Sequence, residues 1–120
     1  MSKKTLIIGA SDNPDRYAYR AANQLQKHGH EVILFGKRSG NVIGQEIIKD
    51  RPMVEAIDTV TLYINPDHQK EWYDYIISIK PKRVVFNPGT ENTEFENLLQ
   101  ENNIEALEAC TLVMLSIGNY

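Results

Sequence analysis

The order in which β-rich runs and helical patterns follow one another is the feature that most constrains how this chain folds. Short runs of β-branched, aliphatic and aromatic residues alternate with longer segments in which apolar residues recur at helical spacing. Helices are predicted at residues 17–27, between Pro66 and the stop at Lys80-Pro81, and around Phe95. Strands are predicted at residues 5–9, 31–35, 58–64, 83–87 and 104–107.

Alternation of this kind produces parallel strands joined by right-handed crossovers, with helices on both faces of the sheet. We therefore expect one α/β domain over residues 1–120: a three-layer, doubly wound (Rossmann-like) five-stranded parallel sheet with strand order 3-2-1-4-5. Residues 45–48 have the character of a short edge strand that follows a turn at 41–44. The apolar tail at residues 111–115 is expected to pack on the domain.

Composition narrows the class of protein. The 120 residues are 42% hydrophobic and 24% charged, which suits one folded domain and excludes a disordered chain. The formal net charge of −3 argues against nucleic acid or an anionic membrane as the main partner, because both need a concentrated basic surface. No apolar run approaches a membrane-spanning helix in length, and Leu6 to Ile8 are too few for a signal-peptide core.

The only cysteine, Cys110, allows no disulfide within the chain. We expect a cytoplasmic protein whose partner is a small-molecule nucleotide ligand rather than a nucleic acid or a membrane. A homodimer through the apolar tail is one option.

The segment after the first predicted strand has the residues of a phosphate-binding turn. Glycine and small side chains let a backbone approach a phosphate, and the start of the next helix offers N–H groups and a positive dipole end. We expect the N–H groups near Ala10 to Asn13 and the Ser11 hydroxyl to face a pyrophosphate. Because the G-x-G-x-x-G fingerprint is absent, an ordinary turn with Ser11 or Asp12 as helix N-cap is the alternative. The candidate binding residues here are Gly9, Ala10, Ser11, Asp12, Asn13, Pro14 and Arg16.

Two cations, Lys37 and Arg38, follow the second predicted strand. NAD-binding domains usually carry Asp or Glu at this place, where it binds the ribose hydroxyls. Lysine and arginine suit a phosphate on that ribose instead, which favours NADP or coenzyme A over NAD. A solvated basic turn is the alternative interpretation.

The turns after the third and fourth predicted strands are weaker candidates. Asn65-Pro66 follows the third predicted strand, and Pro88-Gly89-Thr90 follows the fourth, where Gly89 and Thr90 are placed to lie against the linker of a ligand. Asn65-Pro66 is interpreted from its residues as a structural corner that leads into a helix. A capping turn with Thr90 before the next helix explains the Pro88-Gly89-Thr90 turn equally well.

Catalytic and metal-ligand motifs are missing from the sequence. We therefore expect no catalytic residue and no metal site. His68 is expected at the surface, and Cys110 is expected to be a small buried residue rather than a nucleophile.

The pattern as a whole resembles the stand-alone CoA-binding domain family, which is similar to the N-terminal CoA-binding domain of the succinyl-CoA synthetase alpha subunit. The resemblance covers nearly the whole chain. Its most specific stretches are residues 8–16, the pair Tyr19-Arg20, Leu25 and residues 29–32.

The resemblance implies a site for coenzyme A or an acyl-CoA, with Lys37 inheriting a CoA contact, Tyr19 joining the site and residues 65–67 matching a loop that the synthetase uses. The synthetase's phosphorylated histidine belongs to a second domain that this chain lacks, so the resemblance implies binding without the ligase reaction. Two departures stand out. Phe35-Gly36 replaces the family's common Asn-Pro, and Cys110 lacks the usual arginine before it and acid after it.

Three functions remain open on the sequence. The first is a CoA- or acyl-CoA-binding protein without catalysis of its own. The second is a small NADP-linked oxidoreductase or redox sensor, which is disfavoured because no Tyr-x-x-x-Lys proton-donor pair stands at the ligand edge. The third is an interaction module whose nucleotide site is vestigial.

Overall fold

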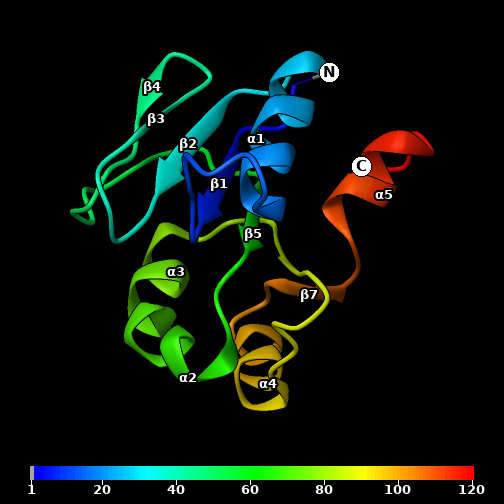
Figure 1. Cartoon of the computed structure of the whole chain (residues 1–120). Coiled ribbons are helices and arrows are strands. Elements are labelled where there is room, and N and C mark those ends of the chain that lie inside the picture. Colours follow the sequence, from blue (N-terminus) through cyan, green and yellow to red (C-terminus); the bar gives the residue numbers. More distant parts are fainter. Residues whose placement is uncertain (1) are drawn as a thin grey trace.

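The computed structural model describes residues 2–120, and a five-stranded parallel sheet forms its centre (Figure 1). The predicted fold class is confirmed, because every strand pair of this sheet is parallel and helices cover both faces. The strands are β1 (Thr5–Ile8), β2 (Val32–Phe35), β5 (Thr59–Leu62), β6 (Arg83–Phe86) and β7 (Glu105–Glu108).

The predicted strand order 3-2-1-4-5 is wrong. The observed order is β2-β1-β5-β6-β7, so the third long strand, β5, pairs with β1 on the side away from β2. The outer edge of β2 is used by a nearer segment: a hairpin of β3 (Asn41–Val42) and β4 (Gln45–Glu46) follows β2, and Ile48 then forms a parallel bridge with Phe35. Of the edge strand predicted at residues 45–48, only Ile48 pairs with the main sheet. The strand order reverses between β1 and β5.

The helices are α1 (Tyr17–Lys27), α2 (Pro66–Gln69), the 3-10 turn η1 (Lys70–Trp72), α3 (Tyr73–Ile79), α4 (Thr93–Glu101) and α5 (Thr111–Ser116). The bounds of α1 match the prediction, because its apolar residues lie on one buried face: Ala18, Ala21, Ala22 and Leu25. The apolar tail packs on the domain as expected, since α5 buries Met114 and Leu115.

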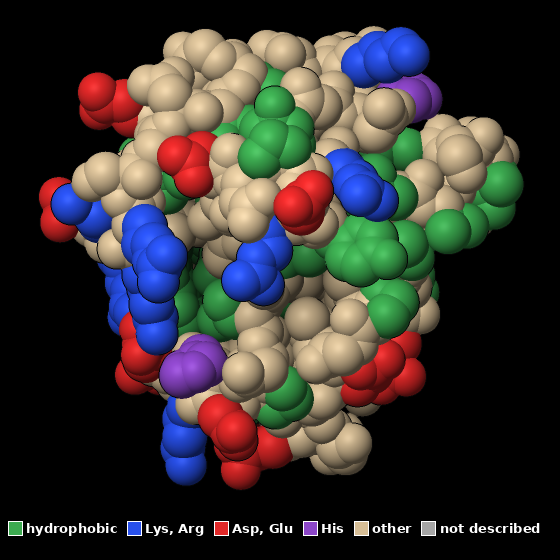
Figure 2. Space-filling model, in the orientation of Figure 1, with side chains coloured by type: hydrophobic (Ala, Val, Ile, Leu, Met, Phe, Trp, Pro, Cys, Tyr) green, Lys and Arg blue, Asp and Glu red, His purple; other side chains and the backbone are tan. Residues whose placement is uncertain are grey.

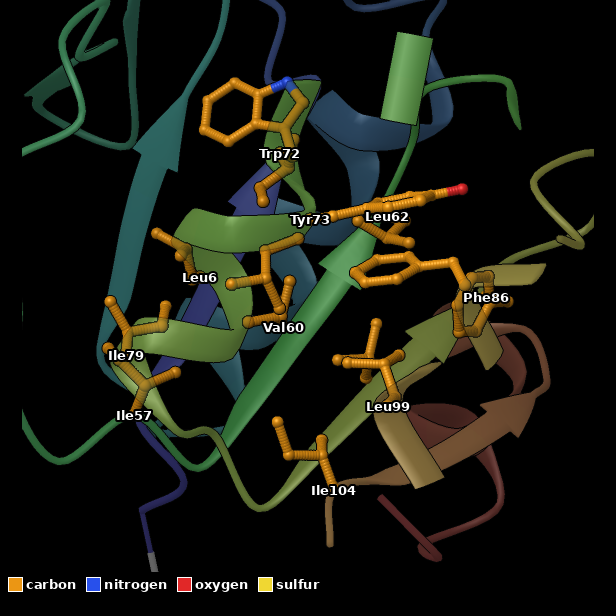
Figure 3. Packing of buried hydrophobic residues seen from close by; sticks show 14 of the residues in the cluster. Leu6, Ile57, Val60, Leu62, Trp72, Tyr73, Ile79, Phe86, Leu99 and Ile104 are labelled. Atoms are coloured by element: carbon orange, nitrogen blue, oxygen red, sulfur yellow. The ribbon is translucent and has the colours of Figure 1, made fainter. Parts of the chain in front are cut away.

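Two apolar cores sandwich the sheet. Successive side chains of β1 point to opposite faces of the sheet. Leu6 and Ile8 belong to the core under α3 and α4, and Ile7 belongs to the core under α1 and α5. Figure 3 shows the first core, where the ring of Tyr73 stacks on Phe95 with centroids 4.2 Å apart. Burial on both faces is typical of a parallel sheet. Ile33 is only half-buried, because β2 lies at the border of the sheet.

Candidate functional site

A cavity of about 660 Å³ opens where the carboxyl ends of β2, β1, β5 and β6 meet. This size is typical of small-molecule sites, and the place is where the strand order reverses. Of the predicted site residues, the structure brings together Gly9, Ala10, Ser11, Asp12, Asn13, Arg16, Lys37, Arg38, Asn65, Pro88 and Gly89.

Three predicted residues, Pro14, Tyr19 and Pro66, do not line the cavity. Tyr19 packs against the core between α1 and the sheet, and Pro66 opens α2 behind Asn65. Thr90, which the sequence placed beside Gly89 as a possible ligand contact, also lines the cavity. Sequence reasoning missed other residues of the wall, namely Tyr17, Ala18, Ser39, Ile47, Tyr63, Ile64 and His68.

Glycines at two positions let the loops around the cavity pack backbone against backbone. Gly9 has a φ of +96°, and a Cβ there would lie 2.8 Å from the carbonyl oxygen of Tyr63. A Cβ at Gly36 would lie 2.7 Å from the carbonyl oxygen of Ala10. Real Cβ atoms do not approach this closely, so Gly36, one of the departures from the family pattern, is required by the contact between the loops after β1 and β2.

The loop after β1 has fewer backbone N–H groups available to a ligand than predicted. The N–H of Ala10 is used by the carbonyl of Phe35 at 2.8 Å, and the N–H of Asn13 donates to Ser11 Oγ at 3.1 Å. The N–H groups of Ala10 and Asn13 are therefore bonded within the protein, although they were expected from the sequence to face a pyrophosphate. The N–H groups of Ser11 and Asp12 have no acceptor anywhere in residues 2–120.

The start of α1 faces the same cavity without a side-chain cap. The N-cap is Arg16, whose side chain makes no capping hydrogen bond, so the predicted alternative of Ser11 or Asp12 as N-cap is wrong. The first turn of α1 carries no acidic residue. A helix N-terminus that has no side-chain cap and no nearby acidic residue presents N–H groups and a partial positive charge to an anion.

Three cations line the cavity: Arg16, Lys37 and Arg38. Within the described part of the chain all ion pairs involve other residues, so none of the three has a carboxylate partner. Asp12 is the acid on the wall, and its side chain lies against Gly40 in the loop after β2. Figure 2 shows Lys and Arg side chains around a hollow on this face. A chain with a net charge of −3 therefore has a locally basic cavity.

Buried polar groups fix the turns after β5 and β6. Asn87 donates to Thr61 Oγ1 at 2.7 Å and accepts from the N–H of Thr111 at 2.9 Å. Gln69 is fully buried and donates to the carbonyls of Ile64, at 3.0 Å, and Thr90, at 2.7 Å. Gln69 therefore ties α2 to the turn that holds Pro88 and Gly89.

Tyr63 is the wall residue with the most perturbed ionisation. Its hydroxyl oxygen is buried and has no hydrogen-bond partner among the described residues. Burial raises the pKa of this hydroxyl far above its usual value. Cys110, the N-cap of α5, lies outside the cavity and is half-buried rather than buried.

In residues 2–120 no helix is long and apolar enough to cross a membrane. The same residues contain no group of three or more His, Cys, Asp or Glu side chains able to hold a metal ion.

Comparisons with known proteins identify relatives. The chain matches the CoA-binding domain family over residues 3–116. A crystal structure described as that of an uncharacterized protein has 57% sequence identity and a TM-score of 0.98, covering 100% of this chain and 99% of that one. No curated protein matches.

More distant structures share the fold. A Thermus thermophilus protein has a TM-score of 0.88 at 20% identity, covering 99% of this chain and 91% of that one. A Pyrococcus horikoshii OT3 protein has a TM-score of 0.83 at 24% identity, covering 97% of this chain and 83% of that one. Since the family match extends over nearly every residue from β1 to α5, the chain belongs to the CoA-binding domain family.

Proposed function

We propose that this chain binds coenzyme A, or an acyl-CoA, at the carboxyl edge of its sheet and catalyses no reaction on it. Membership of the CoA-binding domain family supports CoA binding in general. The observation that carries the proposal is the cavity with three cations, Arg16, Lys37 and Arg38, that form no ion pair within residues 2–120. Unpaired cations on a cavity wall favour an anionic ligand.

The donor set of the cavity fits the phosphates of CoA. The N–H groups of Ser11 and Asp12 and the open start of α1 suit a pyrophosphate. Lys37 and Arg38 follow β2, where a doubly wound sheet receives the adenosine ribose. CoA supplies a 3′-phosphate on that ribose, with which lysine makes a charge-assisted contact and arginine a forked one.

The absence of catalysis is proposed from the chemistry of the wall. Tyr63 is the tyrosine at the end of β5, but its hydroxyl is buried and its pKa is raised, which suits neither proton donation nor proton uptake at neutral pH. His68 lies on the wall, and its ring makes no hydrogen bond to another described residue that would orient it as a base.

Calorimetric titration of the wild type and Lys37→Ala with CoA and 3′-dephospho-CoA tests the proposal. A charge-assisted contact is worth about 1.5–3 kcal/mol, so Lys37→Ala should weaken CoA binding roughly 10- to 100-fold. The affinity for 3′-dephospho-CoA should barely change. Lys27→Ala, which removes the same charge from the exposed end of α1, is the matched control and should bind like the wild type.

Two outcomes would contradict parts of the proposal. An equal loss of affinity for CoA and 3′-dephospho-CoA would exclude Lys37 from the 3′-phosphate contact. Tighter binding of NADP than of CoA would favour the oxidoreductase alternative, since NADP carries its extra phosphate on the 2′ position of the same ribose.

A further inference from the structure

The loop after β2, residues 36–40, touches the loop after β1 at both of its ends. At one end Gly36 packs on the carbonyl oxygen of Ala10. At the other end the side chain of Asp12 packs on Gly40: a Cβ there would lie 2.8 Å from Asp12 Oδ2, 2.9 Å from its Cγ and 3.0 Å from its Cβ. The φ of Gly40 is not positive, so its backbone conformation does not require glycine. The glycine instead leaves room for the Asp12 side chain beside this loop.

This contact places a carboxylate next to the two cations that follow β2. Lys37 and Arg38 lie between the two glycines and line the cavity together with Asp12. Asp12 is the one acidic residue among those that line the cavity. It forms no ion pair with a lysine or arginine of residues 2–120, so the charges of both signs remain available to a ligand. Such a wall favours a ligand that offers a negative group and a hydrogen-bond donor side by side.

The ribose of CoA offers these two groups on adjacent carbons, a phosphate at the 3′ position and a hydroxyl at the 2′ position. In NAD-binding domains an acidic residue after the second strand accepts a hydrogen bond from a ribose hydroxyl. In this chain that place holds Lys37 and Arg38, and a carboxylate comes to the same loop from the loop after β1. NADP has the opposite arrangement, with its phosphate at the 2′ position.

We infer that Asp12 accepts a hydrogen bond from the 2′-hydroxyl of the CoA ribose and rejects a nucleotide that carries a phosphate there. The inference rests on the proposed function, which places the ribose and its 3′-phosphate at Lys37 and Arg38. A hydroxyl donates a charge-assisted hydrogen bond to a carboxylate. A phosphate at the 2′ position removes that donor and brings a second negative charge against Asp12. Asp12 is thus a specificity-determining residue that separates 3′-phosphorylated from 2′-phosphorylated nucleotides.

The experiment compares CoA with its isomer that carries the ribose phosphate on the 2′ instead of the 3′ position. The two ligands have the same composition and charge, so a difference in affinity reports the position of the phosphate. Both are titrated into the wild type by calorimetry at pH 7.5 and low salt. A hydrogen bond to a charged group changes affinity roughly 10- to 100-fold, so we expect CoA to bind at least about 10-fold more tightly than the isomer.

A pair of variants in the loop after β1 separates Asp12 from the cations. Asp12→Asn keeps the shape of the side chain and an oxygen acceptor but removes the charge. It should reduce the ratio of the two affinities at least about threefold, mainly because the isomer binds more tightly. Asp15→Asn removes the same charge from an exposed position of the same loop outside the cavity lining, and should leave the ratio unchanged. Both aspartates are exposed, so neither variant should affect folding.

The outcomes distinguish this inference from the proposed function. A ratio that Asp12→Asn leaves unchanged would overturn the inference. Equal strengthening of both ligands in Asp12→Asn would also overturn it, because the carboxylate would then only reduce the positive potential of the cavity. If the wild type bound the isomer as tightly as CoA, the inference would fail while CoA binding stands. If neither ligand bound, the proposed function would fail and the inference with it.

Discussion

The two edges of the sheet use their cations in opposite ways. At the amino edge, Arg83 donates to Thr59 Oγ1 at 2.8 Å and to the carbonyl oxygen of Tyr120 at 3.1 Å, and its guanidinium lies 4.6 Å from the centroid of the Tyr120 ring. Lys3 donates to the same carbonyl oxygen. At the carboxyl edge, Lys37 and Arg38 make no ion pair or hydrogen bond with any described residue.

This difference separates cations that hold the fold from cations that are available to a ligand. Hydrogen bonds to charged groups stabilise the folded state when both partners belong to the protein. A cation on a cavity wall without a protein partner contributes little to stability, because surface charges that make no contact change the free energy of unfolding only slightly. The comparison therefore predicts that substitutions at the two edges affect different measurements.

The largest effect is expected for a bulky side chain in the loop after β1. Ala10 lines the cavity, so Ala10→Leu fills space that a pyrophosphate would need and should weaken CoA binding by more than about 100-fold. Titration calorimetry measures the loss, and circular dichroism shows whether the variant is folded. Ala10→Ser, which keeps the side chain small, is the control and should bind CoA nearly as well as the wild type. Unchanged affinity in a folded Ala10→Leu variant would count against the site.

The sequence predicted this edge well because the residues that form it are local features. Glycine and small residues after a strand, and two cations after the next strand, can be recognised without knowing how the strands pair. The strand order could not be predicted in the same way. Whether residues 58–64 pair with β2 or with β1 depends on which segment covers the outer edge of β2. In the structure Ile48 pairs with Phe35 at that edge, and residues 59–62 pair with β1 instead.

The details of the site that were missed depend on tertiary contacts as well. Ala10 looks like a phosphate-binding residue in sequence, but its N–H is used by Phe35 once Gly36 brings the two loops together. Gln69 looks like a surface residue of a short helix. In the structure it is buried because the backbone carbonyls of Ile64 and Thr90 need its two N–H groups.

An intermediate effect, on the free energy of unfolding, is expected at the amino edge. There an arginine-to-methionine substitution can be compared with the same substitution at the carboxyl edge. Arg83→Met keeps most of the apolar side chain but removes the hydrogen bonds to Thr59 and Tyr120, and should lower the free energy of unfolding by about 1–3 kcal/mol. For a domain of this size that corresponds to a fall in Tm of roughly 4–12 °C. CoA affinity should not change.

Arg38→Met is the counterpart at the carboxyl edge. It should leave Tm within about 2 °C of the wild type, because Arg38 is exposed and makes no contact that stabilises the fold. Its CoA affinity should fall instead. Thermal unfolding and titration of both variants measure the two effects, and a similar loss of Tm in both would contradict the division between the edges.

The smallest effect is a pH dependence of stability that comes from the amino edge at pH 5.5–7.5. His30 Nδ1 accepts the N–H of Lys3 at 2.9 Å, which requires a ring that is unprotonated at Nδ1. Burial lowers the pKa of His30 below its usual value of 6.5, and the charges of His28, Lys3 and Arg83 lower it further. The unfolded chain therefore takes up this proton at a higher pH than the folded protein does. The stability that the neutral ring contributes is present above pH 6.5 and is lost as the pH falls below that value.

We accordingly expect the Tm of the wild type to fall between pH 7.5 and pH 5.5, by less than Arg83→Met lowers it at neutral pH. His30→Asn keeps an acceptor for the N–H of Lys3 but cannot take up a proton, so its Tm should fall less over the same range. His68→Asn removes the histidine at the carboxyl edge and should follow the wild type, since the ring of His68 makes no hydrogen bond in the described chain. Parallel Tm curves for the wild type and His30→Asn would mean that the amino edge is not the part of the fold that responds to protons.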